Sequence, residues 1–173
     1  SGIASYRIEM DGLTGGHSGM DIHRGRGNAN KLMNRLLWNT SLKFDMRLHS
    51  VDGGSLRNAI PRESVATVTI PNHSKEAFCS AVEALGRDIC AEHGTTDPDM
   101  NVRMSECDSI TTVMSKRDQD NLLRAIYACP LGIYRMSPDI DSLVQTSNNV
   151  ARILVENGNY SIQCLTRSSV DSE

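Results

Sequence analysis

The sequence predicts an α+β fold of the ferredoxin-like type, β-α-β-β-α-β, extended at its C-terminal end by a helix and a β-hairpin. The first observation is the order of the hydrophobic patterns along the chain: some segments have apolar residues at every second position, as in strands, and others at every third or fourth position, as in helices. The second is that each strand-like run alternates apolar and polar residues, as in a sheet with one solvated face. The third is an Asn-Gly pair between two alternating runs near the end.

The first two thirds of the chain supply the core elements. Strands are expected at residues 6–11, 44–48, 65–70 and 100–105, because apolar side chains recur there at every second position. A first helix is expected from about Asn28, a fair N-cap, with Ala29, Leu32, Met33, Leu36 and Leu37 on one face. A second is expected from Ser74 as its cap to Gly94. This order is the split β-α-β pattern, with helices covering one face of an antiparallel sheet.

The C-terminal part is expected to extend this core. A short helix is predicted at residues 118–129, closed by Pro130, followed by a loop at residues 133–142. Strands at residues 150–155 and 160–165 flank Asn157-Gly158, a strong hairpin signal. We therefore divide residues 1–173 into a core at 1–108 and an extension at 109–173. Because the last residues form a capping sequence without a helix after it, we expect the chain to be part of a longer polypeptide.

Composition excludes several classes of function. Only 4% of residues are aromatic, which argues against stacking platforms for single-stranded nucleic acid. The net charge of −3 argues against a surface for duplex DNA, which needs clustered cations. No two of the five cysteines form a C-x-x-C pair, so no zinc knuckle is indicated and a reducing cytoplasm is expected. No signal peptide or membrane-spanning apolar run is present in this sequence.

The most informative stretch is Gly15-Gly16-His17-Ser18-Gly19, which closes the first strand. Clustered glycines indicate a sharp turn or a close approach of the backbone to a ligand. The spacing fits no nucleophile elbow, dinucleotide loop or zinc-protease motif. His17 and His23 lie six residues apart without a carboxylate at ligand spacing, so we expect no metal site within this chain.

Three hydrogen-bond donors remain as candidate site residues. His17 can donate from its imidazole, and Asn58 offers two amide donors after the glycine pair at 53–54. Arg167 presents a planar fork that matches a carboxylate. Each also has an ordinary structural interpretation, since Asn58 can cap a turn and Arg167 can be a surface strand residue. Spacing alone leaves both interpretations open.

Several motifs resemble one zinc peptidase family. They are Gly15-Gly16-His17-Ser18-Gly19, Gly27-Asn28-Ala29-Asn30, Gly53-Gly54-Ser55-Leu56-Arg57-Asn58-Ala59-Ile60-Pro61-Arg62-Glu63, Thr146-Ser147-x-Asn149 and Thr166-Arg167-Ser168-Ser169-Val170-Asp171-Ser172. In this order and nearly end to end, they resemble the lid, or dimerisation, domain of aminoacyl-histidine dipeptidases (Xaa-His dipeptidases, peptidase D). That family includes carnosinase and acetylornithine deacetylase.

The resemblance implies a division of labour within a cytoplasmic dipeptidase. Two zinc ions and the activating glutamate would belong to a catalytic domain of the same polypeptide that this chain lacks. The lid would close over that site, and dimer formation is expected. His17 matches the lid histidine that polarises the scissile carbonyl. Asn58 and Arg167 match substrate-binding positions, with Arg167 holding the C-terminal carboxylate of the dipeptide.

Two alternatives stay open at this point. A free-standing ferredoxin-like module could use His17, Asn58 and Arg167 to bind an amino acid without chemistry. Alternatively, the chain could be a dimerisation scaffold whose glycine motifs only shape turns. One position departs from the family pattern: Gln145 stands where an acidic residue is expected, which bears on substrate preference.

Overall fold

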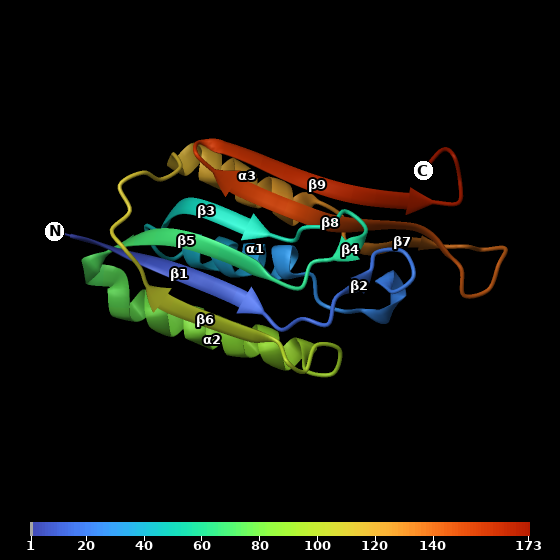
Figure 1. The fold of residues 1–173 in the computed structure, drawn as a ribbon, viewed down its shortest axis with the longest axis horizontal. Coiled ribbons are helices and arrows are strands. Elements are labelled where there is room, and N and C mark those ends of the chain that lie inside the picture. The colour runs from blue at the N-terminus through green and yellow to red at the C-terminus, as the bar shows by residue number, and fades with distance from the viewer. Residues whose placement is uncertain (1) are drawn as a thin grey trace.

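Seven antiparallel strands form the main sheet of this computed structural model, which describes residues 2–173 (Figure 1). The strand order is β6-β1-β5-β3-β8-β7, and β9 pairs with β8 along its length. The strands are β1 (Ile3–Asp11), β3 (Arg47–Gly53), β5 (Ser64–Pro71), β6 (Asn101–Glu106), β7 (Gly132–Met136), β8 (Val144–Glu156) and β9 (Asn159–Ser168). A separate two-stranded sheet pairs β2 (Gly16–His17) with β4 (Ala59–Ile60). This arrangement confirms the α+β prediction.

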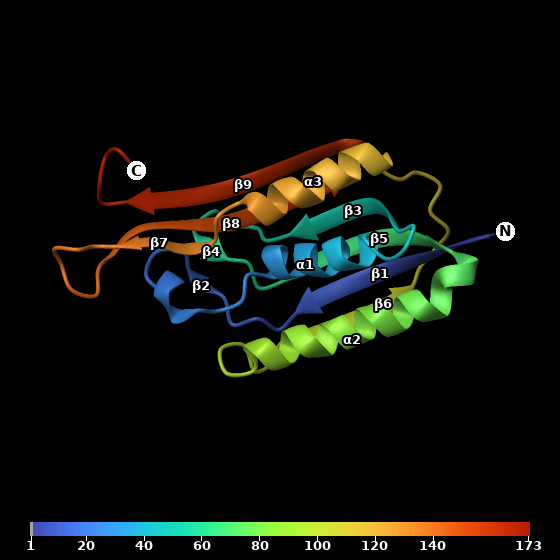
Figure 2. The same cartoon turned by 180° about the vertical axis from the view of Figure 1, so that it is seen from behind.

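Three helices cover one face of the sheet and leave the other face open, as the view from behind shows (Figure 2). They are α1 (Ala29–Ser41), α2 (Lys75–His93) and α3 (Lys116–Ala128), with short 3-10 turns η1 (Ile22–Arg24) and η2 (Asn72–Ser74). The core lies between helices and sheet, where side chains such as Ile8, Leu36 and Phe78 are fully buried. Within residues 2–173, no helix is long and apolar enough to cross a membrane.

Two of the three helices begin at a side-chain N-cap. Asn28 caps α1 by accepting a hydrogen bond from the Lys31 backbone N–H at 3.2 Å, as its amide side chain predicts. Ser115 caps α3 in the same way, accepting from Asp118 N at 3.1 Å, so α3 begins at Lys116, two residues before the expected start at 118. Ser74 precedes α2 but its side chain makes no capping bond, because it ends the η2 turn in helical conformation.

Three strand predictions need correction. The segment 133–142 was expected to be a loop, yet β7 occupies Gly132–Met136; its side chains are largely exposed on both faces, so no alternation marks it. β8 starts at Val144, six residues before the predicted strand, because its first half buries polar side chains instead of apolar ones. β3 begins at Arg47, so most of the run 44–48 is the approach to the strand.

The C-terminal part continues the sheet and the helix layer of the core. β8 pairs with β3 through Val51 and Val155, and α3 packs against α1. Buried amides join the two parts: Asn34 Nδ2 donates to Leu123 O at 3.1 Å, and Gln119 bonds the backbone around β3. The edge of β3 is thereby covered by β8, and the outer strands β6, β7 and β9 each pair with one strand only.

Candidate functional site

The two glycine-rich motifs meet at one corner of the molecule. His17 in β2 pairs with Ala59 in β4, and the Ser18 backbone N–H donates to Asn58 O at 2.8 Å. Segments about forty residues apart in the sequence therefore place His17 and Asn58 side by side. The small β2–β4 sheet is the physical reason, since its backbone bonds fix the two turns against each other.

The His17 imidazole is held in one tautomer. Its Nδ1 atom accepts hydrogen bonds from the backbone N–H groups of Gly19, at 3.1 Å, and Met20, at 3.0 Å. Because Nδ1 acts as the acceptor, the neutral ring carries its proton on Nε2. The half-buried side chain thus presents an N–H donor that the loop itself does not use.

Asp21 fixes the backbone beneath this ring. Its Oδ2 accepts from His17 N at 2.8 Å, and its own N–H donates to His17 O at 2.9 Å. The bond from His17 N lowers the pKa of Asp21 most, and the nearby cations Arg26 and Arg24 lower it further, against the opposing effect of desolvation. Arg26 Nη1 also donates to Gly15 O at 2.6 Å. The carboxylate therefore stays ionised and holds His17 in its turn.

Glycine is required at two positions of this turn. Gly15 and Gly16 have φ angles of 64° and 137°, which side chains with a Cβ rarely adopt. A Cβ at Gly16 would also lie 2.7 Å from Asp21 Oδ2. The glycine cluster therefore serves a tight turn that aims His17.

Arg167 reaches the same corner from the outer strand β9. A Cβ built at Gly19 would lie 3.2 Å from Arg167 Nε and 3.3 Å from His17 Cε1, so Gly19 is flanked by both side chains. Arg167 is exposed, and its guanidinium makes no ion pair or hydrogen bond with residues 2–173. Its planar donors are free to take an external oxygen ligand.

Buried asparagines hold the loop that carries Asn58. Asn149 Nδ2 donates to Ala59 O at 2.8 Å, and Asn28 Nδ2 donates to Asn149 Oδ1 at 3.1 Å. The start of α1 is tied in as well, because Ala29 N donates to Pro61 O at 3.1 Å. Asn58 itself is exposed, and its side chain bonds no other group in the described part of the chain.

The fold thus brings the three predicted residues to one corner: the His17 imidazole and the Arg167 guanidinium flank Gly19, and the Asn58 backbone carbonyl accepts from Ser18 N. Such a set can hold an anionic or carbonyl oxygen ligand. Of the residues that support them, sequence analysis named Asn149 only as part of a family motif and missed Asp21. Asp21, four residues after His17, was the one readable signal, since aspartate side chains often bond nearby backbone N–H groups.

Residues 2–173 hold no group of three or more His, Cys, Asp or Glu side chains that could bind a metal ion. His17 bonds backbone N–H groups through Nδ1, and its neighbouring donors are cationic or neutral. The site described here therefore does not fit a resident metal ion.

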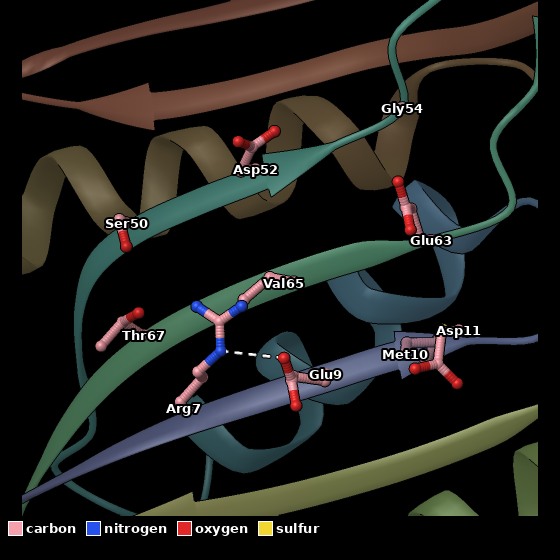
Figure 3. A pocket seen from close by; sticks show the side chains of 10 residues that line it. All are labelled: Arg7, Glu9, Met10, Asp11, Ser50, Asp52, Gly54, Glu63, Val65 and Thr67. Carbon is pink, nitrogen blue, oxygen red and sulfur yellow. Dashed lines mark hydrogen bonds and ion pairs between the residues drawn. The ribbon is translucent and has the colours of Figure 1, made fainter. Parts of the chain in front are cut away.

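Away from this corner, a hollow lies on the open face of the sheet, between β1, β5 and β3 (Figure 3). It measures about 340 Å³ and includes Arg7, Glu9, Asp11, Asp52 and Glu63 but none of the three site residues. Most of its charges are paired: Arg7 Nε lies 2.9 Å from Glu9 Oε1, and Asp11 and Asp52 bond arginines of the neighbouring strands. We interpret it as a solvated charged surface.

Comparison with known proteins points to one family. A family model described as peptidase dimerisation domain matches residues 1–94. The cytosol non-specific dipeptidase of Escherichia coli (strain K12) is 33% identical over 99% of this chain. The crystal structure of aminoacylhistidine dipeptidase from Vibrio alginolyticus superposes with a TM-score of 0.96 at 38% identity, again over 99% of this chain.

The chain spans about a third of each of these relatives, 36% of the Escherichia coli protein and 35% of the Vibrio chain. A putative amidohydrolase/peptidase from Burkholderia cenocepacia matches at a TM-score of 0.50 and 14% identity, over 71% of this chain and 32% of that one. At that identity the likeness shows a shared fold alone.

Proposed function

Because the chain belongs to the peptidase dimerisation domain family, we propose that it is the lid of a cytoplasmic zinc dipeptidase that hydrolyses Xaa-His dipeptides. The observation that carries the proposal is the meeting of His17, Asn58 and Arg167 at one corner, with their donor groups unused by the chain. A dipeptide offers a carbonyl oxygen and a carboxylate, which are the acceptors that such donors suit.

Each side chain has a separate role in this proposal. His17 Nε2–H donates to the scissile carbonyl oxygen, where negative charge develops during hydrolysis. Arg167 binds the C-terminal carboxylate through its planar fork. Asn58 donates to a further oxygen of the substrate and orients the dipeptide. His17 is therefore the catalytic residue of the three, whereas Asn58 and Arg167 bind substrate.

We propose that the metal belongs to the catalytic domain of the same polypeptide, and that this chain alone is inactive. The Escherichia coli and Vibrio proteins are named as dipeptidases, and each is about three times as long as this chain. A homodimer is part of the proposal. Its contact surface is the segment around β7 and the loop after it, which projects from the domain (Figure 1). Apolar side chains are exposed there, with Tyr134 71% and Ile140 59% accessible.

One other function is favoured by a specific observation. The free guanidinium of Arg167 and the free amide of Asn58 would equally suit an amino-acid-binding module without catalysis. Calorimetry with a histidine dipeptide separates the two functions. A module binds the dipeptide on the 173-residue chain itself, whereas a lid binds it only when the catalytic domain is present.

Substitution of His17 by alanine in the parent enzyme tests the catalytic role. Loss of one donor to a developing oxyanion costs about 10²–10³-fold in kcat. We expect this loss with unchanged metal content. His73→Ala is the control, because His73 is an exposed histidine at the η2 turn, remote from the site. If His17→Ala also loses metal, or keeps full turnover, the role assigned to His17 is wrong.

A further inference from the structure

One buried carboxylate, that of Asp97, accepts hydrogen bonds from both ends of the loop that carries His17. Asp97 Oδ1 accepts from the Thr14 backbone N–H at 2.9 Å, and Asp97 Oδ2 accepts from the Gly27 backbone N–H at 2.8 Å. Thr14 precedes the glycine cluster and Gly27 precedes α1, so these two bonds close the whole segment on one side chain. Surface loops of this size with their ends held together are often functional.

Asp97 is itself anchored firmly. The residue is 1% exposed, its backbone N–H donates to His93 O at 2.8 Å, and its carbonyl accepts from Met100 N at 3.0 Å. These bonds tie it to the end of α2 and to the turn before β6. The carboxylate thus joins the loop to the end of α2 and to the turn before β6, both of which belong to the core of the domain.

The hydrogen bonds to Asp97 affect its pKa more than its burial does. Burial raises the pKa of Asp97, but the donors of Gly27, Thr96 and Thr14 lower it further than burial raises it. The Thr96 hydroxyl donates to Oδ2 at 2.7 Å, and His93 Nδ1 lies 3.7 Å from the same oxygen. The residue is therefore an ionised acceptor with several donors, a geometry that a neutral amide cannot reproduce.

We propose that Asp97 is a positioning residue for the reaction: by holding both ends of the Thr14–Gly27 loop it sets where His17 Nε2 points. This inference rests on the proposed function of His17. Misplacement of a catalytic group by about 1 Å can cost about 10²-fold in rate. Since His17 stabilises charge that develops only during reaction, the loss belongs in kcat and leaves KM unchanged.

Asp97→Asn in the parent enzyme is the decisive variant. An amide has one acceptor oxygen, so it can hold the Thr14 end or the Gly27 end of the loop, but not both. We expect kcat to fall at least about tenfold with KM and metal content unchanged. In a His17→Ala background the same substitution should bring no further loss, because the two residues act through one donor.

Gln119→Glu provides a matched control. Gln119 is fully buried, accepts from Leu48 N at 2.7 Å and donates to Met46 O at 3.1 Å. Gln119→Glu likewise replaces one of the pair amide and carboxylate by the other, and it keeps one of the two hydrogen bonds to the backbone. These bonds lie beneath β3, away from the loop that carries His17. We expect Gln119→Glu to lower thermal stability about as much as Asp97→Asn and to change kcat less than twofold.

The outcomes separate this inference from the proposed function. If His17→Ala lowers kcat but Asp97→Asn does not, the positioning role of Asp97 is overturned and the lid function stands. If Gln119→Glu lowers kcat as much as Asp97→Asn, the effect is general destabilisation and the inference also fails.

If His17→Ala leaves kcat unchanged, the proposed function fails, and amide hydrogen exchange on the 173-residue chain decides the anchoring role. Faster exchange across residues 14–27 in Asp97→Asn alone would support it, and unchanged exchange would overturn it.

Discussion

The loop that carries His17 and the strand that carries Arg167 reach the same corner, but only the His17 loop is fixed there by side-chain hydrogen bonds. Every turn of the His17 loop is bonded within the chain, by Asp21, Arg26 and Asp97. Arg167 lies on outer strand β9, and its guanidinium has no partner among residues 2–173. Under the proposed function, the fixed group is the one assigned to the developing charge, and the free group is the one assigned to substrate capture.

Loss of the free arginine should give the largest change that is specific to binding. In the parent enzyme, Arg167→Ala removes charged hydrogen bonds worth about 1.5–3 kcal/mol, so KM should rise about 10–150-fold with little change in kcat. Arg167→Lys should recover part of this loss, because an ammonium keeps the charge without the planar fork. Steady-state kinetics with an aminoacyl-histidine dipeptide measures both constants.

Two comparisons make this prediction sharper. A dipeptide amide lacks the carboxylate, so its KM should be insensitive to Arg167→Ala. Arg103→Ala is the control, since Arg103 pairs with Asp11 on β1 at the opposite side of the sheet. A fall in kcat at constant KM would instead place Arg167 with the fixed catalytic groups, contrary to the comparison above.

The hydrogen bonds that fix the His17 loop can be disrupted by a substitution at Gly16. Gly16→Ala combines a positive φ of 137° with a Cβ 2.6 Å from Arg26 Nη1, and the Arg26 and Asp21 side chains must both give way. We expect the free energy of unfolding in urea to fall by about 1–3 kcal/mol. Gly25→Ala, with φ of 67° and nothing within 4 Å of the new Cβ, should cost about 1 kcal/mol from backbone strain alone. Equal losses would mean that the bonds of Asp21 and Arg26 contribute little.

The ferredoxin-like core was predictable because each of its strands and helices buries one face, so that apolar residues recur at a regular spacing in the sequence. β7 escaped prediction since both of its faces are largely exposed, as Ile133 and Tyr134 show. The first half of β8 escaped for the reverse reason. Its residues Gln145–Asn149 are buried but polar, and their partners come from distant segments such as Pro130 and Ala59. The hydropathy of a segment does not indicate that its polar side chains are buried against distant parts of the chain.

The candidate site was predictable only as far as residue chemistry reaches. The glycines beside His17 indicated a turn, and the fold brings Asn58 and Arg167 to that turn. Asp97 gave no signal, because it follows α2 in an irregular turn and acts on backbone N–H groups more than sixty residues away. Which residues position a site depends on contacts between distant segments, and a single sequence does not record those contacts.

The smallest expected effect separates the exposed Asn58 from the buried Asn149 that supports its loop. Asn58→Ala removes no internal hydrogen bond, so the free energy of unfolding should change by less than about 0.5 kcal/mol. Asn149→Ala removes the hydrogen bond to Ala59 O and the one accepted from Asn28 Nδ2, which keeps only its bond to Val150 O, and should cost about 1–3 kcal/mol. Urea unfolding of the 173-residue chain measures both.

Kinetics of the parent enzyme completes the test of Asn58. One neutral hydrogen bond to substrate is worth about 0.5–1.5 kcal/mol, so Asn58→Ala should weaken kcat/KM by about 2–12-fold without loss of stability. That pattern would group Asn58 with Arg167, among the side chains that the domain leaves free for substrate. If Asn58→Ala destabilises the chain as much as Asn149→Ala and leaves kcat/KM unchanged, Asn58 serves the turn alone. The site would then consist of His17 and Arg167 on either side of Gly19.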